Sequence, residues 1–339
     1  WLGKRDYKVA LSYFLEATEQ GHAQSYFKVG YIYEKGLGVY IDPWTAKRYY
    51  ELSCGFGDAW AANNLGAIYT DGDLGEANFR KAMEYYLLAV ERGHVVACYN
   101  IAEAYLKGRG RQVDREKAVE WYTKAADGGD LLAAQTLTDL YGRNQVKGDE
   151  DDYVYWVERS AELGDVKAMR EVARYYEHGF RVAKNLDRSS YWLNRYMNSV
   201  GEGSEKWKSA IVAYVRLLGK EGWHGHDPEM AFELCIRLDF AEARLILGKL
   251  HLGTVSMRSN PKKGVGLLKR VYRANRDGDG VRSAAAEAAY VLSKCYAEGN
   301  AVKQSLRQSI KWMKASAKIG FKQARYEMAR YAIEGVGMA

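Results

Sequence analysis

The stretch Asp114–Gly129, DREKAVEWYTKAADGG, decides the fold. It opens on Asp114, and the side-chain oxygens of Asp, Asn and Ser accept hydrogen bonds from the unpaired N–H groups of a first helical turn. Ala118, the pair Trp121–Tyr122 and Ala125 then follow at helical spacing, so they share one face. Gly129 comes last, where a left-handed residue ends a helix. The stretch therefore predicts one helix with a marked start, an apolar face and a marked end.

The same pattern recurs along the chain. Nine starts are spaced by 36, 36, 36, 35, 36, 42, 33 and 45 residues, and they are Asp6, Asp42, Asn78, Asp114, Asp149, Asn185, Asp227, Asn260 and Ser305. The three prolines, Pro43, Pro228 and Pro261, each directly follow a start, where proline costs no hydrogen bond. The aromatic residue seven positions after a start is predicted to form the structural core of the repeats, at Tyr49, Tyr85, Trp121, Trp156, Trp192 and Trp312.

A second helix is predicted in each unit. A small residue stands 24 positions after the start, as in Gly30, Gly66 and Ala102, and a tyrosine stands 27 positions after it, as in Tyr33 and Tyr69. We expect the small residue to let the paired helix approach and the tyrosine to fill the adjoining space. One helical hairpin cannot bury its apolar faces alone, so neighbouring hairpins must stack. The sequence predicts an all-α fold of about nine helix-turn-helix repeats of about 36 residues.

Segments such as AVEWYTKAADGGD, NNLGAIYTDG and KVGYIYEKGLGV resemble the Sel1-like repeat, a branch of the tetratricopeptide superfamily. The resemblance is closest over residues 1–180. The unit of Asp227 departs from it by lacking the aromatic pair, and the unit of Asn260 departs by placing Gly264 where alanine is expected. The resemblance implies a right-handed superhelical solenoid that serves as a scaffold for protein assemblies. Many bacterial members of the family work in the cell envelope.

The spacing divides the chain into three parts of one continuous solenoid. We expect regular repeats over 1–196, an irregular junction over 197–226, where NSVGEGSEK supplies turn residues, and divergent repeats over 227–339. The chain opens on Trp1 and closes on EGVGMA, which is typical of a turn between repeats, so we expect the parent protein to continue at one or both ends.

Charge is distributed unevenly along the chain. Residues 1–170 hold 21 lysines and arginines against 26 acidic residues, whereas residues 171–339 hold 29 against 17. Candidate partner-binding residues lie in one basic segment, at Lys262, Lys263, Lys269, Arg270, Arg273 and Arg276. One interpretation is a docking surface for an acidic protein or an anionic polysaccharide; the other is a solvated helix face. Nothing resembles a major-groove reader or a base-stacking platform, so no nucleic-acid partner is expected.

Two stretches invite a metal-site interpretation. His224, His226, Asp227 and Glu229 could form a metal cluster, but Asp227 is already explained as a helix cap. Asn275–Gly280 matches the opening of a calcium loop, yet position twelve is Ala286, which favours an inserted loop. The four cysteines, Cys54, Cys98, Cys235 and Cys295, are too widely spaced for a zinc or disulfide framework. We therefore expect no metal, no cofactor and no catalytic site.

The leading hypothesis is a non-enzymatic scaffold or adaptor that binds proteins through the concave groove of the solenoid. The alternative is an envelope component that binds an anionic polysaccharide, or assembles an export complex, through the basic C-terminal half. No run of apolar residues is long enough for a transmembrane helix, and no Asn-x-Ser/Thr sequon occurs. These features favour a bacterial periplasmic or cell-envelope location.

Overall fold

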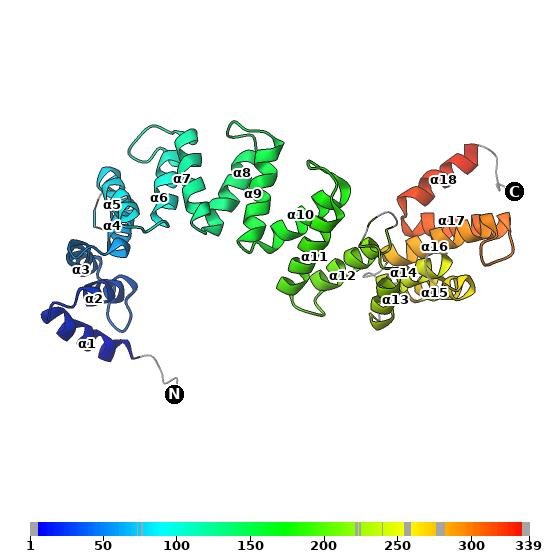
Figure 1. Ribbon diagram of the computed structural model, residues 1–339, viewed down its shortest axis with the longest axis horizontal. Coiled ribbons are helices and arrows are strands. Elements are labelled where there is room, and N and C mark those ends of the chain that lie inside the picture. The colour runs from blue at the N-terminus through cyan, green and yellow to red at the C-terminus, as the bar shows by residue number, and fades with distance from the viewer. Residues whose placement is uncertain are drawn as a thin grey trace. The chain divides into compact units, whose positions relative to one another are not determined.

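The computed structural model describes residues 6–72, 74–75, 77–220, 223, 225–238, 240–253, 259–275 and 282–333, and their regular secondary structure is entirely helical. Eighteen helices follow one another in pairs within these residues (Figure 1). The first five pairs are α1 (Tyr7–Glu19) and α2 (Ala23–Lys35), α3 (Pro43–Gly55) and α4 (Ala59–Asp71), α5 (Phe79–Glu91) and α6 (Ala97–Lys107), α7 (Arg115–Asp127) and α8 (Leu131–Gly142), and α9 (Glu150–Glu162) and α10 (Val166–His178). The last four pairs are α11 (Leu186–Val200) and α12 (Glu205–Leu218), α13 (Pro228–Arg237) and α14 (Ala241–Leu252), α15 (Pro261–Asn275) and α16 (Arg282–Glu298), and α17 (Leu306–Ile319) and α18 (Lys322–Ile333). The predicted nine hairpins are confirmed.

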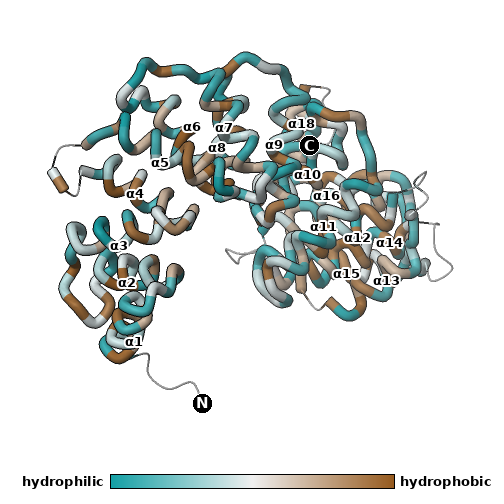
Figure 2. Tube along the Cα trace, turned by 60° about the vertical axis from the view of Figure 1, so that its left-hand side comes forward, coloured by the Kyte–Doolittle hydropathy of each residue, from teal (hydrophilic) through white to brown (hydrophobic). Residues whose placement is uncertain are grey.

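The chain forms two compact units, Trp1–Val172 and Ala173–Ala339. Hydrophobic and hydrophilic residues alternate along the helices (Figure 2), because each helix has one face against its neighbours and one face in water. The segment 197–226 holds the end of α11, a turn, and α12, whose first turn is capped by Ser204. None of the described helices has both the length and the hydrophobicity needed to cross a membrane.

The nine predicted starts all cap helices. The Asp114 carboxylate, for example, accepts a hydrogen bond of 2.9 Å from the backbone N–H of Lys117. The same interaction recurs at the other eight starts. Gly129 has φ of 95°, as the predicted left-handed end of α7 requires.

A backbone latch joins successive repeats. The N–H of a capping residue donates to the carbonyl of the tyrosine nine residues earlier, at 3.0 Å from Asp42 to Tyr33 and 2.8 Å from Asn78 to Tyr69. Asp149 differs, since the unit before it is one residue shorter. Its N–H instead donates to the Asp152 carboxylate at 3.0 Å, in a capping box within α9.

The small residues 24 positions after a start set the distance between repeats. A Cβ atom added to Gly66 on α4 would lie 2.5 Å from the Tyr86 ring on α5, and one added to Gly30 would lie 2.8 Å from the Tyr50 ring. The helix that the small residue admits therefore belongs to the next repeat in the chain. Tyr50 and Tyr122, both eight positions after a start, are fully buried in these contacts.

The aromatic residues seven positions after a start lie beside this contact. Tyr49 stacks on Tyr33 with ring centroids 6.4 Å apart, and Tyr85 stacks on Tyr69 at 5.6 Å. Trp156 and Trp192 are buried, whereas Tyr49, Tyr85, Trp121 and Trp312 are half-buried.

The eighth repeat uses glycine where five of the other repeats use alanine, because two backbones meet there. A Cβ atom on Gly264 of α15 would lie 2.7 Å from the carbonyl oxygen of Gly248 on α14. This approach explains why the unit departs from the repeat pattern.

Terminal helix α18 is attached to α16 by one buried carboxylate. Glu327 accepts hydrogen bonds from Lys294 Nζ at 3.0 and 3.1 Å and from the Tyr290 hydroxyl at 2.9 Å. Burial by itself would raise the pKa of Glu327, but the bonds from Lys294 and Tyr290 outweigh it and hold the pKa below its ordinary value.

Substituting Gly66→Ala should lower the free energy of unfolding by about 1–3 kcal/mol, because the added methyl group overlaps the buried Tyr86 ring. Urea denaturation followed by circular dichroism measures the change. Gly55→Ala is the matched control, since its Cβ would meet nothing within 4 Å and should leave stability equal or slightly higher. Equal stability of Gly66→Ala and the parent protein would contradict the spacing role.

Acidification should release α18 from α16. A carboxylate whose pKa is lowered by folding stabilises the folded protein at pH values above its pKa in the unfolded chain. This stabilisation is lost as the pH falls through the lower pKa of the folded state. Hydrogen-exchange protection of α18, corrected for intrinsic exchange rates, should fall in this acid range. In Glu327→Gln the protection should already be reduced at neutral pH and should depend little on acid; a parent-like acid profile in this variant would reject the assignment.

Candidate functional site

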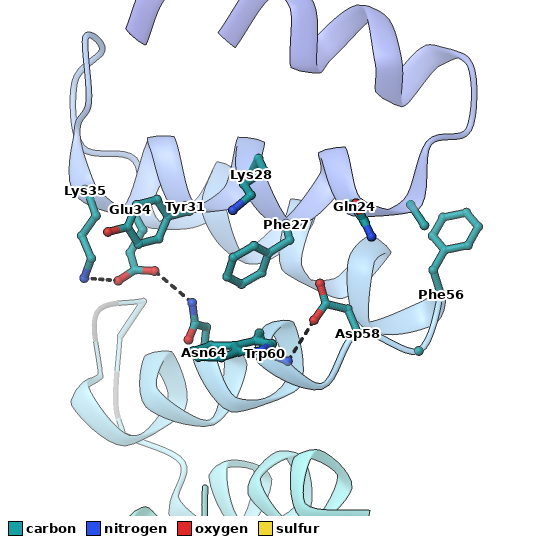
Figure 3. Close-up of a pocket in the computed structure, with 12 residues that line it drawn as sticks. Gln24, Phe27, Lys28, Tyr31, Glu34, Lys35, Phe56, Asp58, Trp60 and Asn64 are labelled. Carbon is teal, nitrogen blue, oxygen red and sulfur yellow. Dashed lines mark hydrogen bonds and ion pairs between the residues drawn. The ribbon is translucent and has the colours of Figure 1, made fainter. Parts of the chain in front are cut away.

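A groove runs between α2 and α4, the second helices of the first two repeats (Figure 3). Its volume is about 930 Å³. Helix α2 contributes Gln24, Phe27, Lys28, Tyr31, Glu34 and Lys35, which recur at helical spacing and so lie along one face. Helix α4 and the turn before it contribute Phe56, Asp58, Trp60 and Asn64. We call this surface the α2–α4 groove.

Aromatic rings form both walls of the α2–α4 groove. On the α2 wall, Phe27 stacks against Tyr31 with centroids 6.4 Å apart and contacts the buried Tyr50 at 5.6 Å. On the α4 wall, the Trp60 ring lies 4.2 Å from the ring of His94 in the next repeat. Trp60 is nevertheless 59% exposed and Tyr31 is 40% exposed. These rings are held in place from behind while their other faces meet solvent.

His94 supports Trp60 as a neutral ring. It is buried, and this burial lowers the pKa of His94, against a smaller opposite effect of the Asp58 carboxylate. The imidazole is therefore uncharged at neutral pH, and Trp60 packs on it as on another apolar ring.

Most charges in the α2–α4 groove are already paired. Glu34 accepts a 2.5 Å hydrogen bond from the Tyr50 hydroxyl, forms an ion pair with Lys35, and receives a long 3.5 Å contact from Asn64. Burial and the adjacent Glu34 both raise the pKa of Tyr50, so its hydroxyl remains a donor. Asp58 caps α4 through the N–H of Trp60 at 2.9 Å and also accepts from the Ser53 hydroxyl.

Lys28 is the exception. Its side chain is exposed, and its ammonium lies 5.6 Å from the Phe27 ring centroid. Among the residues that the structure describes, no carboxylate pairs with Lys28. Sequence reasoning could not find this groove, because its two walls come from different repeats, on helices that begin 36 residues apart, at Ala23 and Ala59.

The basic segment predicted for partner binding lies on the solvent face of α15. Lys262, Lys263, Arg270 and Arg273 are exposed, and Lys269 is half-buried with its ammonium 3.1 Å from the Tyr296 hydroxyl. Arg276 lies outside the described residues. The inward side of this helix is apolar and packs against α16 through Leu268 and Val271.

Helix α17 adds a second row of cations that the sequence reasoning missed. Arg307, Lys311, Lys314 and Lys318 follow at intervals of 4, 3 and 4 residues, all exposed, so they form one stripe. A contact between Tyr272 of α15 and Trp312 of α17, with centroids 5.0 Å apart, makes the two helices neighbours. Neither helix contains an acidic residue. We call the exposed cations of α15 and α17 the basic face.

The two stretches that could have bound a metal are only partly described by the structure. Asp227 caps α13, accepting from the N–H of Met230 at 2.8 Å. His224 and residues 276–280 lie outside the described part of the chain, as does the side chain of Asn275. In the part that is described, no three His, Cys, Asp or Glu side chains gather as metal ligands would.

Stacked helical hairpins with a groove between second helices define a helical repeat protein of the solenoid class. The particular family is the Sel1 repeat family, to which this chain belongs. The Sel1 repeat model matches residues 2–22, 23–54, 61–94, 95–130, 140–165, 166–195 and 286–321. The unmatched residues 196–285 include the eighth repeat's close Gly248–Gly264 approach.

A solved structure supports this fold. A protective antigen of uropathogenic Escherichia coli strains, c5321, which displays an SLR fold, is similar over 98% of this chain and 77% of its own, at 22% identity and a TM-score of 0.50. A Sel1 repeat protein from Oxalobacter formigenes is 29% identical over 58% of this chain and 78% of its own, with a TM-score of 0.45.

Proposed function

We propose that this chain is a non-enzymatic scaffold that binds an extended segment of a partner protein in the α2–α4 groove. The observation that carries the proposal is a pair of exposed aromatic walls, Phe27–Tyr31 and Trp60, fixed from behind by Tyr50 and His94. Rings held in this way lose little conformational entropy on binding, and Trp and Tyr are the side chains that dominate binding energy in protein interfaces.

The dimensions of the α2–α4 groove suit a peptide. Gln24 and Lys35 are eleven residues apart on α2, which corresponds to about 16 Å along a helix. About five residues of an extended chain cover that length. Membership of the Sel1 repeat family supports a protein-binding role over a catalytic one.

Trp60→Ala should weaken peptide binding by about 30-fold or more, the effect of losing a central aromatic anchor. Peptides are first selected on the full chain from a displayed random library, and their affinities for each variant are then measured by fluorescence anisotropy. Trp44→Ala removes another exposed tryptophan, 64% exposed and outside the groove, and should change nothing. Equal binding by the Trp60→Ala and Trp44→Ala variants would exclude the α2–α4 groove as the binding surface.

A second candidate function rests on the basic face. We propose as the alternative that the chain is an envelope component that binds an anionic polysaccharide, or assembles an export complex, through this surface. Its support is the two neighbouring helices α15 and α17, which carry only cations among their charged side chains. Such a surface concentrates an anionic polymer through many weak, salt-sensitive contacts.

Replacing the four cations of the α17 stripe with glutamine should lower the salt concentration at which the full chain elutes from immobilised alginate. The control replaces four exposed cations of the first unit, Lys8, Arg48, Arg115 and Arg170, and has the same net charge. If both variants elute at the same salt concentration, retention depends on net charge alone and the basic face is not a binding site.

A further inference from the structure

We infer that the α2–α4 groove recognises an extended peptide segment in which an aromatic or large apolar side chain stands two residues from a carboxylate. This rests on the proposed function, because it assigns the chemistry of the partner that the groove would hold. It follows from three features of the groove: its aromatic slot, its unpaired positive charge and its available amides.

The aromatic slot sets the apolar part of the ligand. Phe27 projects from α2 toward Trp60, whose ring lies flat along α4 on the opposite side (Figure 3). Trp60 cannot move away from the slot without losing its contact with His94, whose ring centroid lies 4.2 Å away at a tilted angle. A flat or bulky apolar side chain inserted between the walls would bury ring surface on both sides.

The unpaired cation sets the charged part. Lys35 is neutralised by Glu34, and the Asp58 carboxylate is satisfied at the N-terminus of α4, where negative charge is favourable. Lys28 therefore supplies the remaining uncompensated charge among the described residues that line the groove. A carboxylate complements it, whereas a lysine or arginine in the ligand would be repelled.

The position of Lys28 sets the spacing between the apolar side chain and the carboxylate of the ligand. Its ammonium lies 5.6 Å from the centroid of the Phe27 ring, on the α2 side of the groove (Figure 3). In an extended chain, side chains two residues apart lie on the same face at roughly 6.6 Å, whereas adjacent side chains point to opposite faces. A carboxylate two residues from the inserted side chain would thus reach Lys28.

The amides favour an extended backbone over a helix. Gln24 is exposed at one end of the groove, and Asn64 at the other end makes a long contact of 3.5 Å with Glu34. Each amide offers both donor and acceptor atoms, which match the N–H and C=O groups of an unpaired peptide backbone. A helical ligand would have these groups already bonded within itself.

The test is a selection of random heptapeptides displayed on phage, performed on the full chain and on its Lys28→Glu variant. The parent protein should enrich sequences with Trp, Phe, Tyr or Leu two residues from Asp or Glu. Lys28→Glu should keep the aromatic preference and change the flanking preference to Lys or Arg. Arg48→Glu, an exposed cation outside the groove, should select the same peptides as the parent.

The affinities of the selected peptides test two claims separately: that Lys28 sets the acidic preference, and that the α2–α4 groove is the binding site. Lys28→Ala should weaken the acidic peptides about fivefold and should not affect versions with Gln in place of the acid. An acidic preference that persists in Lys28→Glu, or enrichment of aromatic peptides with no acid, would overturn the inference while leaving the groove as a protein-binding site. Peptides that bind equally to Trp60→Ala would instead reject the groove itself. Lys28 is exposed, so circular dichroism and thermal denaturation should show both of its variants folded as the parent.

Discussion

The contact on which the structure depends is the packing of a buried tyrosine on a glycine of the preceding repeat. Tyr86 lies so close to Gly66 that no Cβ atom fits between them, and Tyr50 lies on Gly30 in the same way. A helical hairpin cannot bury its apolar face alone, so this contact decides how closely neighbours stack. The backbone latch from a capping residue to the tyrosine nine residues earlier, present at Asp42, Asn78, Asp114, Asn185 and Ser305, then fixes the register in which these repeats stack.

The same tyrosine connects this packing to the groove. Tyr50 rests on Gly30, contacts the Phe27 ring at 5.6 Å and donates its hydroxyl to Glu34. Two groove residues are therefore positioned by a side chain that is itself fully buried. Because the spacing contact and the groove share Tyr50, the aromatic wall of α2 is held by the core and does not rely on the ligand to order it.

The repeat frame could be predicted from the sequence because its signals are local. A capping oxygen bonds N–H groups two or three residues away, so nine starts fix nine helices without knowledge of the tertiary structure. The relative burial of the paired rings, such as Tyr49 and Tyr50, could not be ranked, since it depends on which ring meets Gly30. The α2–α4 groove could not be predicted from the sequence for the same reason, because it too depends on which helices meet. The α17 stripe, by contrast, was readable from its spacing of 4, 3 and 4 residues.

The two candidate surfaces differ in the range of the forces that they use. In the α2–α4 groove, Glu34 is paired with Lys35, Asp58 caps α4 and Lys28 has no carboxylate partner among the described residues, so recognition rests on close packing of rings with a short-range charge contact. The basic face holds its cations at the surface, where salt screens them over about 8 Å at physiological ionic strength. A short peptide and a long polyanion are therefore not competing descriptions of one site: each surface is suited to only one of them, and each unit carries one such surface.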